Sequence, residues 1–305
     1  MQSEGDIMAA EITEGAVIEV SEVVRGARSE STDDLVIDLR PDVDEPDAAS
    51  DEPAVSDDDV AGSPRQVVPG PLNGRIAVVT GGALGVGREV ALGLARAGAR
   101  VCVLGREIAQ LRETVDLAGP EAAVLFLQCD VGSVSEIDGV VDFIERFDRP
   151  IDLLVHAEGV QVRGGVEHGS ITDLDEQYLV NVRGPYLMTQ RLLASLRSAH
   201  GHVVFVSAST SVGDDVDFGQ FAVTSHGVVA LADTLRREVE AAGVRVTTIQ
   251  PEAPTADPST DSVVALTPAD IARSVLHAVE LPAEVEITDI RLRPRRVAAG
   301  DDSSV

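Results

Sequence analysis

From residue 74 onward, short apolar runs alternate with longer segments in which apolar residues recur at helical spacing. The runs predict buried strands at 75–80, 99–105, 122–131, 151–157, 202–208, 245–251 and 285–292. The segments between them predict helices at 88–99, 107–119, 133–147, about 175–196, about 219–241 and 268–280. Strictly alternating strands and helices form a parallel sheet with helices on both faces. The pattern therefore predicts an α/β fold, a doubly wound parallel sheet of about seven strands.

The first 70 residues lack this alternation and are strongly acidic. They contain nineteen Asp or Glu residues against four Arg residues. Such a segment buries too little apolar area to offset the entropy lost on ordering, so 1–70 is predicted to be a disordered acidic tail. Its two apolar stretches, 16–24 and 33–39, are either docking peptides that order on a partner or incidental aliphatics in a solubilising tail. The expected organisation is the tail 1–70, a folded domain 71–298 and a flexible C-terminal tail 299–305.

Composition excludes several classes of function. A formal net charge of −28 opposes binding to a nucleic-acid backbone, which requires clustered cations. All 24 basic residues are Arg, so no chemistry that needs a lysine amine is available. Cys102 and Cys129 fall in apolar runs and are interpreted as core residues, because two cysteines make no disulfide framework. Without a signal-peptide pattern or an apolar run near the ~20 residues of a membrane helix, we expect a cytoplasmic protein.

A glycine-rich turn at 80–87 joins the first predicted strand to the first predicted helix. Glycines allow the backbone to turn tightly and to approach a pyrophosphate without an intervening Cβ atom. The helix that follows presents free N–H groups and its positive dipole end to the anion. The strand–turn–helix context favours a nucleotide site over a turn that only packs helix on strand. Its candidate binding residues are Thr80, Gly81, Gly85, Val86 and Gly87.

This turn resembles the cofactor-binding turn of the short-chain dehydrogenase/reductase family, which has a Rossmann-type fold, and the similarity spans about 74–294. Asp130 with Val131 resembles the family's pair after the third strand, where the Asp contacts adenine. Asn181 resembles the helix asparagine that organises a proton-relay water. Arg106 lies where the family places a cation for a 2′-phosphate, so the resemblance implies NADP rather than NAD, unless Arg106 is only a solvated surface charge.

The positions that carry the family's proton chemistry are all replaced. The resemblance implies a Tyr that transfers a proton, a Lys four residues later on the same helix face, and a Ser that binds the substrate carbonyl. Phe221 stands at the Tyr position, Ser225 at the Lys position and Ala208 at the Ser position. A phenyl ring has no acidic proton, and loss of general acid catalysis costs ~10²–10⁴-fold in rate. We therefore expect that ordinary carbonyl reduction is absent.

Other polar residues near these positions could take over the lost chemistry. Glu158 follows the fourth predicted strand, where the family carries a small residue, and it disfavours an anionic dinucleotide unless its side chain points away. The two tyrosines, Tyr178 and Tyr186, lie on the preceding helix. The family's Thr after the sixth strand is displaced, at best to Thr255. The remaining candidates for a relocated role are Ser207, Ser209, Asp215, His226 and Glu252.

Two further groups carry weaker signals. His200 and His202 have no Cys or carboxylate partner at ligand spacing, so no metal site is expected. The arginines that close the last strand are interpreted as a cap or subunit contact; they are Arg291, Arg293, Arg295 and Arg296.

The adenine and pyrophosphate half of the site thus resembles the family, whereas the nicotinamide half departs from it. This asymmetry favours a redox-silent subunit that binds NADP and acts as a homo-oligomer, beside an active relative, or through a partner of the acidic tail. Two alternatives remain: an NADP-dependent oxidoreductase or an enzyme with relocated acid/base chemistry, and an interaction protein that has lost the cofactor.

Overall fold

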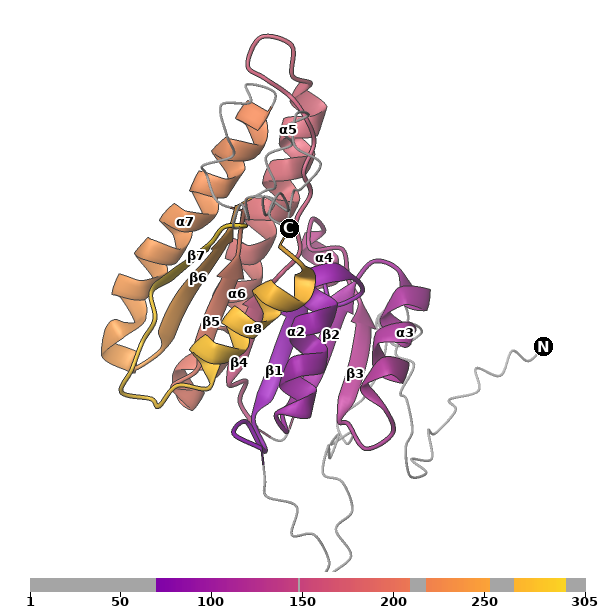
Figure 1. Cartoon of the computed structure of the whole chain (residues 1–305), viewed down its shortest axis with the longest axis vertical. Helices are drawn as coiled ribbons and strands as arrows, with labels where there is room; N and C mark the ends of the chain where they lie inside the picture. The colour runs from indigo at the N-terminus through magenta and orange to yellow at the C-terminus, as the bar shows by residue number, and fades with distance from the viewer. Residues whose placement is uncertain (1–69, 148, 209–217, 253–265, 295–305) are drawn as a thin grey trace, which may run out of the picture.

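The computed structural model of the protein describes residues 70–147, 149–208, 218–252 and 266–294. Within these ranges the chain forms a single parallel sheet flanked by helices (Figure 1). The strands are β1 (Ile76–Thr80), β2 (Arg100–Gly105), β3 (Val124–Gln128), β4 (Leu153–His156), β5 (His202–Val206), β6 (Arg245–Pro251) and β7 (Asp289–Leu292). Their order in the sheet is β3-β2-β1-β4-β5-β6-β7, and all neighbouring pairs are parallel. The predicted doubly wound α/β fold is confirmed.

The helices are α2 (Gly85–Arg96), α3 (Ile108–Ala118), α4 (Val134–Ile144), α5 (Ile171–Tyr178), the π-helical segment η1 (Leu179–Arg183), α6 (Gly184–Ala199), α7 (Gly219–Val239), the 3₁₀ turn η3 (Glu240–Ala242) and α8 (Pro268–Val279). The predicted tail residues 1–69 and 299–305 lie outside the described residues, so the domain boundaries remain predictions.

Each face of the sheet has its own apolar core. One core packs the sheet against α2, α3 and α8, with side chains such as Val90, Leu111 and Val275. The other packs it against α4, α6 and α7, with side chains such as Ile137 and Leu192. Because the central strands are buried on both faces, they are continuous apolar runs, which is why they could be located from the sequence. Both cysteines are buried free thiols, as predicted, with Cys102 in β2 and Cys129 directly after β3.

Two helices begin earlier than the periodicity predicts. α2 begins at Gly85 rather than at 88, because the glycines of the turn enter its first turn after the extended residue Leu84. The helix expected from about 175 begins at Ile171, where the Ser170 hydroxyl accepts a hydrogen bond from Asp173 N. That helix is also divided by the π-helical segment η1, which the 3.6-residue pattern does not predict.

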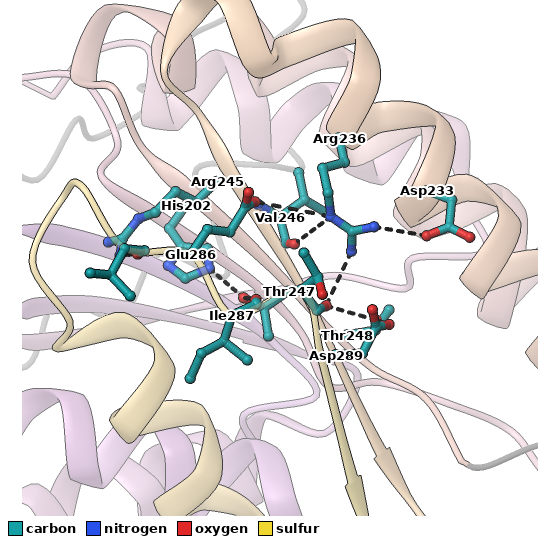
Figure 2. A network of polar contacts seen from close by, with 12 residues as sticks. His202, Asp233, Arg236, Arg245, Val246, Thr247, Thr248, Glu286, Ile287 and Asp289 are labelled. Atoms are coloured by element: carbon teal, nitrogen blue, oxygen red, sulfur yellow. Dashed lines mark hydrogen bonds and ion pairs between the residues drawn. The ribbon is translucent and has the colours of Figure 1, made fainter.

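The last strand is shorter than the predicted 285–292, because polar side chains replace part of its ladder. A Glu286 carboxylate oxygen accepts a hydrogen bond from Val246 N at 2.7 Å, and Arg236 Nη2 donates to Thr288 O at 3.1 Å. Figure 2 shows these side chains gathered beside β6, together with Arg245. The chain before β7 is therefore fixed to β6 and α7 by side-chain contacts, and regular strand pairing starts only at Asp289.

Candidate functional site

The order in which the chain adds strands to the sheet reverses at β1. From β1 the chain proceeds outward to β2 and β3 and then returns to β4 on the other side of β1 (Figure 1). Open α/β sheets bind ligands outside the carboxyl ends of the strands at such a reversal. Here those ends are Thr80 and His156, which are paired across β1 and β4. The segments that follow them, the glycine-rich turn and residues 157–160, therefore form the candidate site.

The glycine-rich turn is tightly packed on its inner side and open on its outer side. Gly81 and Gly85 have left-handed φ angles of 68° and 56°. A Cβ atom on Gly87 would lie 2.5 Å from the carbonyl carbon of Gly81, so only glycine allows this approach. A Cβ on Gly85 would meet no atom within 4 Å, and Leu84 caps α2 without a side-chain hydrogen bond. The first N–H groups of α2 thus face open space, which fits a phosphate.

The other residues expected to bind nucleotide follow the neighbouring strands. Arg106 is exposed directly after β2. Asp130 follows β3, and its Oδ1 accepts a hydrogen bond from Gly132 N at 2.8 Å. Val131 is buried at 2% exposure, where it packs in the core rather than facing solvent. The structure thus brings the turn, Arg106 and Asp130 to the same edge of the sheet.

Glu158 points toward the glycine-rich turn rather than away from it. The carboxylate lies near the Gly81 N–H, which stabilises its charged form, while Oε2 is buried with no hydrogen-bond partner among the described residues. The pKa of Glu158 is raised to about 7: burial is the largest cause and nearby Asp130 also raises it, while Arg106 and the Gly81 N–H lower it. A charged carboxylate at this point repels a bound anion. The Glu158 side of the site is therefore less suited to a dinucleotide than the side formed by the N-terminus of α2.

Asn181 lies in η1 and joins three segments. Its Oδ1 accepts a hydrogen bond from Val160 N at 2.7 Å, and its Nδ2 donates to Val160 O at 2.8 Å and to Thr224 Oγ1 at 3.2 Å. The π-helical turn places this side chain between the loop after β4 and α7. Both amide hydrogens are therefore used within the protein, and the expected role in organising a water remains a prediction.

A cavity of about 60 Å³ lies beside Asn181, at the carboxyl ends of β4 and β5. Ala208 and Phe221, at the family's Ser and Tyr positions, both line it, as do Glu158 and Ser207. This volume is enough for a few water molecules but not for a dinucleotide. The structure therefore brings Ala208 and Phe221, two of the three positions at which the resemblance implies proton-transfer residues, to one cavity.

Several other candidates lie away from this cavity. Ser225 is buried one helical turn beyond Phe221 on α7 and is not among the lining residues. Tyr178 and Tyr186 are half exposed and do not line it either. His226 is exposed and its ring contacts Ala222 O within the same helix at 2.8 Å. None of these side chains supplies a hydroxyl or imidazole to the cavity.

The remaining candidates are separate from the site or cannot be placed. The amide of Glu252, after β6, donates to Leu292 O, so this residue belongs to the β6–β7 end of the sheet. Arg291 and Arg293 are exposed at and after β7. Ser209, Asp215, Thr255, Arg295 and Arg296 lie outside the described residues.

The two histidines considered as a metal pair point to different partners. His200 Nδ1 contacts Ala242 O at 2.9 Å, and His202 Nε2 contacts Thr247 Oγ1 at 2.8 Å (Figure 2). In the part of the chain that the structure describes, no group of three or more metal-ligating side chains occurs.

His156 is a site residue that the sequence reasoning did not single out. It ends β4, lines the cavity, stacks on Phe205 with ring centroids 4.9 Å apart, and contacts Thr189 Oγ1 through Nε2 at 2.9 Å. Burial lowers the pKa of His156 to about 3, so the ring is neutral at physiological pH. Its signal in the sequence is a histidine that ends an apolar strand, two residues before Glu158 in the segment opposite the glycine-rich turn.

A family model described as short chain dehydrogenase matches residues 75–262. The chain belongs to the short-chain dehydrogenase family. This dehydrogenase-family chain is 30% identical over 240 residues to the farnesol dehydrogenase of Aedes aegypti, covering 72% of this chain and 96% of that protein. It is 29% identical over 250 residues to the glycine betaine reductase ATRR of Emericella nidulans, covering 76% of this chain but only 20% of that protein.

Solved structures of short-chain dehydrogenases share the fold. A metagenomic short-chain oxidoreductase in complex with NADP superposes with a TM-score of 0.65 at 25% identity, covering 74% of this chain and 100% of that chain. An alcohol dehydrogenase from the archaeon Thermococcus sibiricus, complexed with 5-hydroxy-NADP, superposes with a TM-score of 0.66 at 23% identity, covering 74% of this chain and 99% of that one. Among the residues described for this short-chain dehydrogenase, none of the helices has the length and apolarity needed to cross a bilayer.

Proposed function

We propose that this short-chain dehydrogenase is a redox-silent member of its family that binds NADP and acts through association rather than through carbonyl reduction. The observation that carries the proposal is the cavity beside Asn181, where Phe221 and Ala208 stand in place of a phenol and a hydroxyl. When bound, a nicotinamide dinucleotide supplies or accepts a hydride. In the family's reaction a Tyr hydroxyl supplies the accompanying proton, and the phenyl ring of Phe221 has none to give.

Binding of the nucleotide is supported by the open N-terminal turn of α2. A Cβ on Gly85 would meet no atom within 4 Å and no side chain caps the helix, which supports binding of a phosphate by the first backbone N–H groups of α2. Arg106 supports NADP over NAD, because an exposed guanidinium after β2 suits a 2′-phosphate. The NADP complex of the metagenomic relative is consistent with this choice.

Association with another subunit would give a silent subunit its role. α5, α6 and α7 carry the exposed apolar side chains Tyr178, Tyr186 and Val223, which suit a contact with a second copy or with an active relative. The acidic segment 1–70 is a second means of recruiting a partner, and the cytoplasm is the proposed compartment. On this proposal the nucleotide stabilises the fold and its contacts rather than serving as a reagent.

The test combines nucleotide binding with turnover on the full chain. NADPH fluorescence is titrated at about pH 6, and nicotinamide absorbance is then followed with ketones, aldehydes and 3-oxo esters. We expect saturable binding and no oxidation. The matched variant Ala208→Ser/Phe221→Tyr/Ser225→Lys restores the three side chains and is expected to gain slow NADPH oxidation, whereas Phe221→Tyr alone stays inactive. Sustained oxidation by the wild type would contradict the proposal, and absence of NADPH binding would favour an interaction protein without cofactor.

A second candidate function is an enzyme in the same cavity, favoured by one specific observation. Glu158 lines the cavity, and its pKa of about 7 is suited to general acid or base catalysis near neutral pH. The names of the relatives, a dehydrogenase and a reductase, also support an oxidoreductase. A turnover rate that follows a single ionisation near pH 7 and is lost in Glu158→Gln would favour this function over the silent one.

A further inference from the structure

The Glu158 carboxylate lies at the point where the sheet reverses. Gly81 comes directly after β1 and Glu158 comes two residues after β4, on neighbouring strands. The two segments are in close contact, since a Cβ on Gly81 would lie 2.8 Å from both Ala157 O and Glu158 N. Within this contact the Gly81 N–H lies near the Glu158 carboxylate and stabilises its charged form. A side chain of the protein therefore already occupies the space beside one of the amides of the glycine-rich turn.

The groups that face Glu158 do not neutralise its charge. Among the described residues, Arg106, after β2, is the one cation that lowers its pKa, and its side chain is exposed to solvent. Asp130, after β3, adds a like charge, and the Cys129 thiol beside it is buried and protonated. Oε2 has no hydrogen-bond partner among the described residues. The charged carboxylate is thus stabilised by Arg106 and by the nearby Gly81 N–H, against desolvation and a neighbouring carboxylate.

A dinucleotide bound at the reversal brings further negative charge to this place. Its pyrophosphate would be held by the N-terminus of α2, where the glycine-rich turn ends, and the rest of the molecule would lie along the carboxyl ends of the strands. Two anions that compete for one set of donors in a partly buried site repel each other. Binding is therefore coupled to the charge of Glu158 and to its position beside Gly81.

We propose that Glu158 determines which ligands the nucleotide site accepts, by competing with phosphate-bearing dinucleotides for the glycine-rich turn. The inference rests on the proposed nucleotide binding and adds a specificity determinant to it. The site admits the dinucleotide when Glu158 is protonated or displaced, so binding takes up a proton. Affinity is highest below the pKa of this carboxyl group, about 7, and decreases as the pH rises above it.

The expected change in Kd with pH follows from the fraction of the protein that is able to bind the dinucleotide. If only the protonated form binds, the apparent Kd is the intrinsic Kd divided by the protonated fraction. With a pKa of about 7, that fraction decreases roughly tenfold between about pH 6 and about pH 8. We expect the Kd for NADPH to rise roughly tenfold over this range in the wild type.

The experiment compares three full-length proteins by fluorescence titration with NADPH and with NADH at both pH values. Glu158→Gln keeps the shape of the side chain and removes its charge, and it is expected to bind with the low-pH affinity at both values. Glu121→Gln, an exposed position before β3, removes one acidic charge far from the site and is expected to follow the wild type. NADH has no 2′-phosphate, so a pH effect shared by both ligands reports on the protein. Far-UV circular dichroism checks that each variant is folded.

The outcomes separate this inference from the proposed function. Equal pH dependence in the wild type and Glu158→Gln, with measurable binding in both, overturns the role of Glu158 and leaves nucleotide binding intact. Binding by Glu158→Gln but not by the wild type supports the inference in its strongest form. Absence of binding in both proteins at both pH values overturns both proposals. If Glu158→Gln does not fold, a pH-independent Kd in the wild type overturns the inference, and a tenfold change seen with both ligands supports it.

Discussion

Gly87 makes the closest backbone contact of the glycine-rich turn, and substitution with alanine tests whether this contact fixes the turn. A Cβ at position 87 would lie 2.5 Å from the carbonyl carbon of Gly81, nearer still to its oxygen, and 3.1 Å from Gly82 N. Ordinary contacts begin near 3.4 Å, so the backbone must separate by about 1 Å. Overpacking of this kind costs about 1–3 kcal/mol. Since backbone atoms cannot rotate out of the way, we expect the upper end of that range.

The matched control is Gly93→Ala in the same helix. There the new Cβ would lie 2.6 Å from Cδ1 of Leu276, the end of a side chain that can change rotamer. Alanine also gains roughly 1 kcal/mol over glycine inside a helix, which offsets part of that adjustment. We therefore expect Gly93→Ala to change the free energy of unfolding by less than about 1 kcal/mol in either direction.

Urea denaturation of the full chain, followed by far-UV circular dichroism, measures both variants. For a folded region of this size, each kcal/mol corresponds to roughly 2–4 °C in Tm, so thermal melts give a second reading. Gly87→Ala is expected to lose about 3 kcal/mol and to bind NADPH more weakly than Gly93→Ala, because the turn that holds the phosphate is displaced. Equal stability of the two variants would refute the argument that this contact excludes a side chain.

Three further predictions concern buried polar groups. Burial raises the pKa of the thiols of Cys102 and Cys129. An aromatic disulfide reagent should therefore leave both thiols unmodified in the folded protein and modify both after denaturation in urea. Rapid reaction of the native chain would contradict their burial. Burial lowers the pKa of His156 to about 3, so unfolding takes up a proton below about pH 6.5 and stability is lost as the pH decreases toward 3. Between about pH 6 and 5, urea denaturation should show the wild type losing about 1 kcal/mol more of its free energy of unfolding than His156→Gln. The same pH dependence of stability in both proteins would contradict this. Asn181→Ala should lower the free energy of unfolding by about 1–3 kcal/mol, because it removes both hydrogen bonds to Val160 and leaves that backbone without partners; no change in urea midpoint would show that the bonds are replaced.

Two parts of the site show what the local sequence pattern can predict and what it cannot. The β1–turn–α2 unit could be recognised because strand burial, glycine placement and helix periodicity are encoded in consecutive residues. The π-helical turn at Asn181 could not, because its extra residue follows from the bonds that join this side chain to Val160 and Thr224 in other segments. For the same reason, the sequence predicts that Glu158 lies near the cofactor but does not predict the direction in which its side chain points.

What the chain determines by itself is its order of strands and helices, its acidic N-terminal composition and the identities of Ala208, Phe221 and Ser225, where the family resemblance implies catalytic side chains. These are properties of residue identity and short-range periodicity. Only the tertiary structure decided that Glu158 turns toward Gly81 and that Phe221 closes a cavity beside Asn181. Both results depend on contacts between segments far apart in the sequence. The reversal of the sheet beside β1 brings those segments together, and no local pattern specifies the direction in which their side chains meet.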